Sequence, residues 1–152
     1  RVEPGPQRPG LVRALERGWL GSVVDSRQVR SPVSGEGRLM SCAETIEGVR
    51  SRRKTVTRRQ GWLMLKKGDR LQLCEKVMGR QGAPLVRLAV VEVTSVRREP
   101  LEYMTVADVA REAVPGMEDV DASVWVEWYC DKFGVTPYSL VTRIEFRYLD
   151  AP

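Results

Sequence analysis

The sequence predicts an α+β protein with a mostly antiparallel, barrel-like β-sheet flanked by short helices. Three observations support this class. The chain has 152 residues, of which 42% are hydrophobic, enough to bury one core. Its β-branched segments follow one another across short turns, without the crossover helices that a parallel sheet needs. Helical patterns occur only before the first of these segments and ahead of the last.

Residues 1–39 differ from the rest, because Pro and Gly residues gather at both ends of this segment. We expect the segment to be disordered and to contribute little to a core, so that its deletion leaves the thermal midpoint nearly unchanged. Codons for residues 35–37 (Gly-Glu-Gly) can spell a purine-rich ribosome-binding sequence just before Met40, the first methionine. Residues 1–39 are therefore expected to be a translated leader or, alternatively, a flexible extension, with the domain spanning 40–152.

The elements of the first half are short. A capping-box pattern at Ser41–Glu44 predicts a helix that continues to about Val49. The β-branched run Thr55–Thr57 predicts a strand. A turn at Lys67–Asp69 precedes a second strand, expected over residues 71–77.

The second half begins with the clearest strand, expected over residues 85–97 and ended by Pro100. Thr105 has the character of a helix cap, and the helix that it begins is expected to stop at Pro115. A further helix is predicted over 123–133, followed by a closing strand over 140–149. The buried stripe predicted for that helix is Val124, Trp128 or Val126, Cys130 and Phe133.

The composition excludes several classes of chemistry. The chain has no histidine, which removes Ser-His-Asp and Cys-His catalysis, histidine metal sites and zinc deaminase chemistry. Its three cysteines form no C-x-x-C pair and fit reduced thiols in a cytoplasmic protein. We therefore expect no metal and no cofactor. No apolar run approaches the ~18 residues that span a bilayer, so no membrane partner is expected.

The positive charge is concentrated in the first part of the chain. Residues 1–60 contain 13 Lys and Arg against 6 Asp and Glu, whereas residues 61–152 contain 12 against 14. Six cations lie within the ten residues Arg50–Arg59. Such a run favours RNA or another phosphate-bearing partner. The alternative is a solvated basic face with no partner.

Residues 54–59 (Lys-Thr-Val-Thr-Arg-Arg) resemble the signature of the ASCH superfamily, a glycine followed by Lys-Thr-x-Thr-x-Arg. Gly48 lies farther from the lysine than in the usual Gly-x-Lys spacing. Further similarities occur in residues 66–71, 109–112 and 141–146, so the resemblance covers roughly 40–149. It implies a PUA-like β-barrel flanked by helices and with a cleft on one side. Small ASCH proteins of this form are common in bacteriophage and actinobacterial genomes.

The ASCH superfamily is generally regarded as RNA-binding, and one bacterial branch hydrolyses acetylated cytidine. Carried over by position, the catalytic set of that branch is Lys54, Thr57 and Glu112, and the motif arginine is Arg59. A threonine hydroxyl attacks only when a base takes its proton, and without histidine the base is a lysine or a carboxylate. Neighbouring cations are expected to favour the neutral form that Lys54 needs for this role.

The geometry of a strand imposes a condition on this site. Along an ideal strand Lys54 points away from the face of Thr57, so the two converge only if the chain bends near Lys54. Two functions stay open: an RNA- or nucleotide-binding domain without chemistry, or an amidohydrolase acting on an acylated cytidine nucleoside. The oligomeric state is open, with a monomer favoured. The residues expected to bind the ligand are Arg53, Thr55, Arg58, Arg59 and Trp62.

Overall fold

The computed structural model describes residues 37–77 and 81–150, nearly all of which belong to one unit of the chain, Leu39–Pro152. The expectations for residues 1–36 fall outside these residues. Strand β2 spans Arg38–Ser41, and its Met40 side chain is buried. The first strand of the described residues therefore begins two residues before the methionine at which the sequence places the start of the domain.

The sheet is a curled half-barrel with the strand order β2-β4-β5-β6-β3. The strand pairs β4–β5, β5–β6 and β3–β6 are antiparallel. This arrangement confirms the α+β class and the mostly antiparallel sheet predicted from the sequence. Strands β3 to β6 span Val56–Arg59, Arg70–Cys74, Arg87–Pro100 and Leu140–Tyr148.

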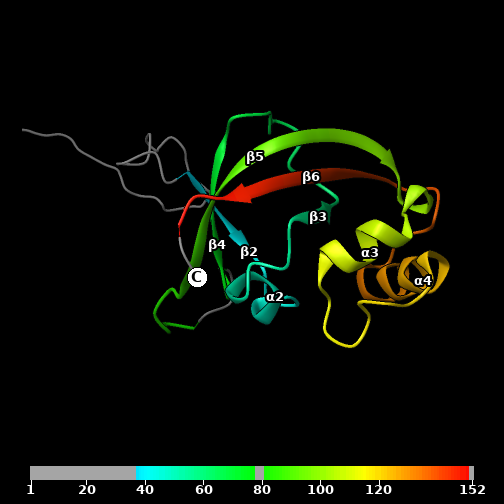
Figure 1. Ribbon diagram of the computed structural model, residues 1–152, viewed down its shortest axis with the longest axis horizontal. Coiled ribbons are helices and arrows are strands. Elements are labelled where there is room, and N and C mark those ends of the chain that lie inside the picture. Colours follow the sequence, from blue (N-terminus) through cyan, green and yellow to red (C-terminus); the bar gives the residue numbers. More distant parts are fainter. Residues whose placement is uncertain (1–36, 78–80, 151–152) are drawn as a thin grey trace, which may run out of the picture. The chain divides into compact units, whose positions relative to one another are not determined.

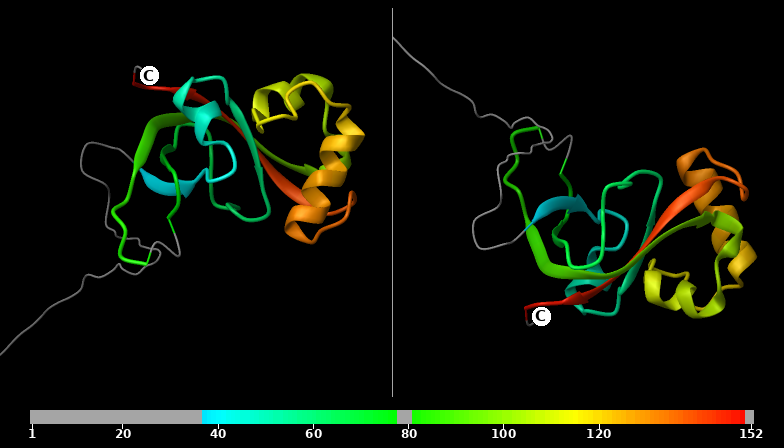
Figure 2. Two further views of the ribbon diagram at one scale, coloured as in Figure 1. Left: turned by 90° about the horizontal axis from the view of Figure 1, so that it is seen from below. Right: turned by 90° about the horizontal axis from the view of Figure 1, so that it is seen from above.

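Strands β5 and β6 form a long antiparallel pair that extends between the two groups of helices (Figure 1). Helix α2 (Ile46–Arg50) lies with β2 and β4 toward one end of this pair. Helices α3 (Val106–Glu112) and α4 (Ala122–Phe133) lie together at the other end, and two further views agree (Figure 2). The short 3-10 helix η3 (Leu101–Tyr103) directly follows β5.

The helix boundaries confirm some predictions and correct one. The oxygen Oγ1 of Thr105 accepts a hydrogen bond from the backbone N–H of Asp108, which is the predicted cap of α3. Helix α4 ends at Gly134, which has a φ of +69°, as predicted. The prediction that Ser41 begins a helix is wrong, because Ser41 is the last residue of β2 and α2 begins only at Ile46.

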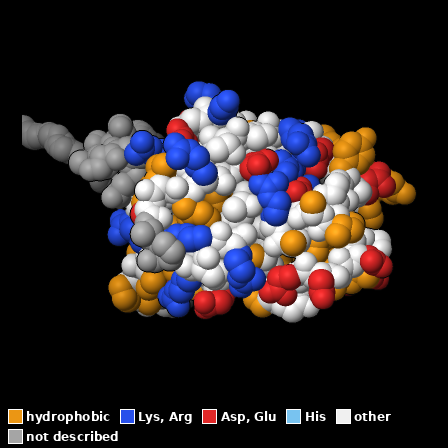
Figure 3. Space-filling model, in the orientation of Figure 1, with side chains coloured by type: hydrophobic (Ala, Val, Ile, Leu, Met, Phe, Trp, Pro, Cys, Tyr) orange, Lys and Arg blue, Asp and Glu red, His pale blue; other side chains and the backbone are white. Residues whose placement is uncertain are grey.

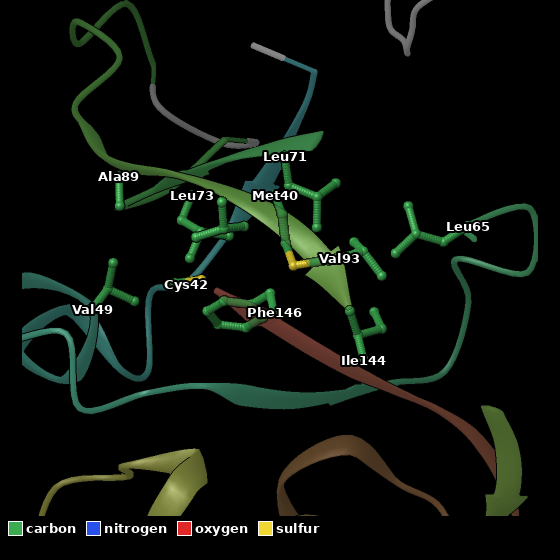
Figure 4. Close-up of a cluster of buried hydrophobic side chains, with 11 residues drawn as sticks. Met40, Cys42, Val49, Leu65, Leu71, Leu73, Ala89, Val93, Ile144 and Phe146 are labelled. Carbon is green, nitrogen blue, oxygen red and sulfur yellow. The ribbon is translucent and has the colours of Figure 1, made fainter. Parts of the chain in front are cut away.

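Buried hydrophobic side chains form two clusters. The first, the sheet core, fills the space between the curled sheet and α2 (Figure 4). The second, the helical core, joins α3 and α4 to the start of β6. The stripe predicted for α4 is confirmed at Val126, which is buried, and is wrong at Val124 and Phe133, which are 45% and 41% exposed. The residues that the helix buries are Trp125, Val126 and Tyr129, so two aromatic positions outside the predicted stripe belong to the buried face.

Candidate functional site

The chain bends between α2 and β3, and the bend brings Lys54 and Thr57 to one pocket. Arg52 has a left-handed backbone with a φ of 64°, and the backbone N–H of Lys54 donates to the carbonyl of Gly48 at 3.0 Å. Lys54 therefore lies ahead of the regular strand, which begins at Val56. This meets the condition that the sequence imposed on the Lys54–Thr57 pair.

A close approach at Gly48 sets the position of α3. A Cβ atom added to Gly48 would lie 2.6 Å from the Cβ of Ala113, closer than two carbon atoms can pack. Ala113 is the left-handed cap of α3 and directly follows Glu112. Because Gly48 has no side chain, the last turn of α3 reaches the motif and carries Glu112 to Lys54.

Lys54 and Glu112 form a buried ion pair. The Lys54 ammonium donates to Oε1 of Glu112 at 3.1 Å and to the Glu112 backbone carbonyl at 2.9 Å. The hydroxyl of Tyr148 donates to the Lys54 carbonyl from the other side. A carboxylate, rather than a group of cations, is thus the direct partner of Lys54, contrary to what the run of arginines suggested.

Arg58 lies at the centre of an internal ion network, with its side chain fully buried. Its guanidinium donates to Asp108 at 2.8 Å, to Glu99 at 3.0 Å and to Glu112 at 3.4 Å. Burial alone would raise the pKa of Asp108, but hydrogen bonds from Arg143 and Arg58 lower it to about 2. Arg58 is therefore held by carboxylates and is not part of an exposed basic surface.

The outer cations of the run are paired one to one with carboxylates. Arg50 contacts Glu75 at 2.6 Å and Arg52 contacts Asp150 at 3.1 Å. Figure 3 shows one face of the molecule, on which Lys and Arg side chains lie next to Asp and Glu. Five of the six cations of the run are thus divided among ion pairs.

A pocket of about 250 Å³ adjoins the Lys54–Glu112 pair. Its lining comes from three parts of the chain: the segment 41–45, the motif with its following residue, and the helices α3 and α4. Aromatic rings of α4 supply one part of the wall. The lining includes Lys54, Thr57, Arg59, Glu112, Trp125 and Trp128.

Arg59 differs from the other two cations of the pocket. Its Nε donates to Oγ1 of Thr57 at 3.1 Å, and its Nη2 lies 3.7 Å from the sulfur of Cys42. Lys54 and Arg58 both pair with Glu112, whereas Arg59 has no carboxylate partner in the part of the chain that the structure describes. Among these three pocket cations, Arg59 is therefore the one whose charge no described carboxylate neutralises.

Three residues predicted to bind the ligand do not line the pocket. The oxygen Oγ1 of Thr55 accepts a hydrogen bond from Arg111, and Trp62 packs against the sheet core. Arg53 lies 3.7 Å from Glu118. The predicted ligand-binding residues do not include the aromatic wall, although its residues 125, 128, 129 and 133 have a helical spacing that indicates one face.

The element order and the curled sheet define an α+β fold with a mostly antiparallel half-barrel sheet flanked by helices, which is the architecture that the resemblance implied. Among solved structures, the chain is similar to protein EF3133 from Enterococcus faecalis V583, with a TM-score of 0.51 and 17% identity. That similarity covers 75% of this chain and 76% of the other.

Two further structures are similar at a TM-score of 0.49. One is an ASCH domain from Lactobacillus crispatus JV V101, with 17% identity over 81% of this chain and 85% of the other. The second is the hypothetical protein PH0355, with 16% identity over 74% of this chain and 97% of the other. No family model and no curated protein matches the sequence.

Two other sequence expectations concern metals and membranes. In residues 37–77 and 81–150, no three Cys, Asp or Glu side chains are grouped so that they could hold a metal ion. Within the same ranges, no helix has the length and apolar character needed to cross a bilayer.

Proposed function

We propose that the pocket binds a single nucleoside or nucleotide, either free or within an RNA chain. The observation that carries this proposal is the composition of the pocket wall, which combines aromatic rings of α4 with the charged side chains of the motif. Aromatic rings stack on bases of any sequence, and cations contact phosphates. Trp128 is partly exposed beside the buried Trp125, with 5.5 Å between their ring centroids, and supplies a stacking surface.

Arg59 supports a ligand that carries a phosphate. A guanidinium without a carboxylate partner can hold a phosphate through two parallel hydrogen bonds. Lys54 and Arg58 already share Glu112, so they add little further attraction for an anion. The proposed ligand therefore places its base against α4 and its phosphate at Arg59.

Binding measurements on cytidine monophosphate and a short RNA test this proposal. We expect Arg59→Ala to weaken both and to reduce the slope of log K against log salt by about one unit, because one phosphate contact is lost. Arg53→Ala is the matched control, since Arg53 belongs to the same run but pairs with Glu118 outside the pocket. Equal slopes for the parent and Arg59→Ala would contradict the phosphate contact.

A second candidate, hydrolysis of an acylated cytidine, is favoured by the presence of Lys54, Thr57 and Glu112 in one pocket. In this reaction Lys54 passes a proton to Glu112 along their hydrogen bond and then accepts the proton of Thr57. The Thr57 oxygen attacks the acyl carbonyl, and the C–N bond breaks as the amine leaves with the proton from Glu112. Water then hydrolyses the threonine ester and releases the acid.

Acetate release from acetylated cytidine tests the second candidate. We expect Thr57→Val to abolish release while weakening ligand binding by only about 0.5–1.5 kcal/mol, the contribution of one neutral hydrogen bond. Lys54→Met and Glu112→Gln should also abolish release. Thr55→Val is the matched control, because Thr55 lies two residues away and outside the pocket. A parent that binds RNA but releases no acetate would eliminate the hydrolase for this substrate and leave the binding proposal standing.

A further inference from the structure

Two residues of the pocket wall carry buried hydrogen-bond donors without an acceptor. Nε1 of Trp125 and Nε of Arg58 have no hydrogen-bond partner in the described part of the chain. Both residues line the pocket. Neighbouring polar groups are satisfied, since the Tyr129 hydroxyl donates to the Arg58 carbonyl at 3.2 Å. A buried donor that stays unpaired lowers stability, and nearly all such donors in folded proteins have a partner.

Trp125 cannot easily turn its ring to find a partner elsewhere. The ring is 1% exposed and belongs to the helical core. It stacks on Tyr129, with 5.4 Å between ring centroids and 25° between the planes, and it contacts Trp128 edge-on. A phenylalanine at this position would supply much of the same packing and would bury no hydrogen-bond donor. Packing therefore does not explain why the buried ring carries an indole N–H.

We propose that the indole N–H of Trp125 donates to a ring carbonyl oxygen of the bound base, such as O2 of cytosine. This inference rests on the proposed function and narrows its ligand to bases that present a carbonyl to α4. An oxygen of this kind accepts without donating, which suits an indole N–H that has no acceptor in the described part of the chain. A donor that is desolvated before the ligand arrives discriminates strongly against a ligand that lacks the acceptor.

The experiment pairs one atomic change in the ligand with one in the protein. Cytidine monophosphate and its 2-thio analogue differ only at the acceptor, where sulfur accepts hydrogen bonds weakly. Affinities of both ligands are measured for the parent, for Trp125→Phe and for Trp128→Phe. Trp128 is the matched control, since it lies on the same helix, lines the same pocket and has no orphaned buried nitrogen.

We expect the 2-thio analogue to bind the parent and Trp128→Phe about three- to tenfold more weakly than cytidine monophosphate, which is the loss of one neutral hydrogen bond. Trp125→Phe should bind the two ligands equally, because its donor is already absent. A steric effect of the larger sulfur would instead appear in all three proteins. If Trp125→Phe does not fold, NMR of the parent replaces it: the Trp125 indole proton should shift downfield with cytidine monophosphate and less with the analogue.

The possible failures are distinguishable. An equal penalty for the analogue in all three proteins, or an indole proton that does not respond to the acceptor atom, overturns the role of Trp125 and leaves nucleotide binding intact. A parent that binds neither ligand overturns the proposed function, and the role of Trp125 falls with it.

Discussion

The run Arg50–Arg59 contains two kinds of cation that look alike in the sequence. Arg50, at the outer end, is half exposed and has one carboxylate partner, Glu75. Arg58, only eight residues later, is fully buried among three carboxylates. The first lies on the surface of α2 and the second on the inner side of β3, so the same residue type has two different physical roles.

The difference shows that local charge density does not predict a basic surface. Exposed pairs contribute little to stability, because water and salt screen them. Buried cations must be neutralised by carboxylates, and these carboxylates cancel the attraction that the cation would offer to a phosphate. Substitutions at the two kinds of arginine test this contrast.

Arg58→Ala is expected to destabilise the protein by about 3–5 kcal/mol, since it leaves buried carboxylates without their shared partner. The free energy of unfolding in urea measures this effect. A loss below about 1 kcal/mol would mean that Arg58 behaves like the exposed arginines and that the inner half of the run is not distinct.

Gly48→Ala is expected to destabilise by about 2–3 kcal/mol, the upper part of the range for overpacking, because the new Cβ would meet the Cβ of Ala113 at 2.6 Å. Denaturant unfolding measures the loss. Gly61→Ala is the control, as a Cβ at Gly61 has no atom within 4 Å and should change the stability little. Comparable losses in the two variants would argue against a special contact between α2 and α3.

Acid should weaken the inner network in a defined pH range. The pKa of Asp108 is lowered from 3.8 to about 2, so the folded state favours the ionised carboxyl. Its contribution is fully present above about pH 4 and is lost as the pH falls through 2. We expect a decrease of about 1–2 kcal/mol in unfolding free energy between pH 4.5 and 2.5, and a smaller decrease in Asp108→Asn. Parallel pH profiles for the two proteins would contradict this role of Asp108.

Arg50→Ala and Arg53→Ala should have the smallest effects, of at most about 1 kcal/mol each, and less in high salt. Arg53 lies 3.7 Å from Glu118 and should contribute less than Arg50, which lies 2.6 Å from Glu75. Urea unfolding curves at low and high salt measure the loss of stability in each variant and its dependence on salt. A loss above about 2 kcal/mol in either variant would remove the contrast with Arg58.

Features that depend on neighbours in sequence could be predicted. The cap at Thr105 involves a residue three positions away, and the end of α4 depends on Gly134 alone. Strand β2 was missed because Ser41 offers a helix-capping pattern that its pairing in the sheet overrides. Only Val126 of the buried face of α4 could be predicted, because the bulky rings at positions 125 and 129 are buried beside it and lie outside the simplest apolar spacing.

The candidate site depends even more on contacts between residues that are far apart in the sequence, which sequence patterns do not reveal. Lys54 and Glu112 are 58 residues apart, and of the sequence observations only the family resemblance relates them. The burial of Arg58 depends on Glu99 and Asp108, which lie 41 and 50 residues away. Nothing near Arg58 in the sequence indicates these partners, so its charge was read as surface charge.

The β5–β6 pair passes through both hydrophobic cores. Val93 on β5 and Ile144 on β6 belong to the sheet core, whereas Val141 of β6 and Leu101, which follows β5, belong to the helical core. Neither core can open fully without breaking this ladder, so the two should melt as one cooperative unit. The amide protons of β5 and β6 should accordingly be the slowest to exchange with deuterated water, at a rate set by global unfolding.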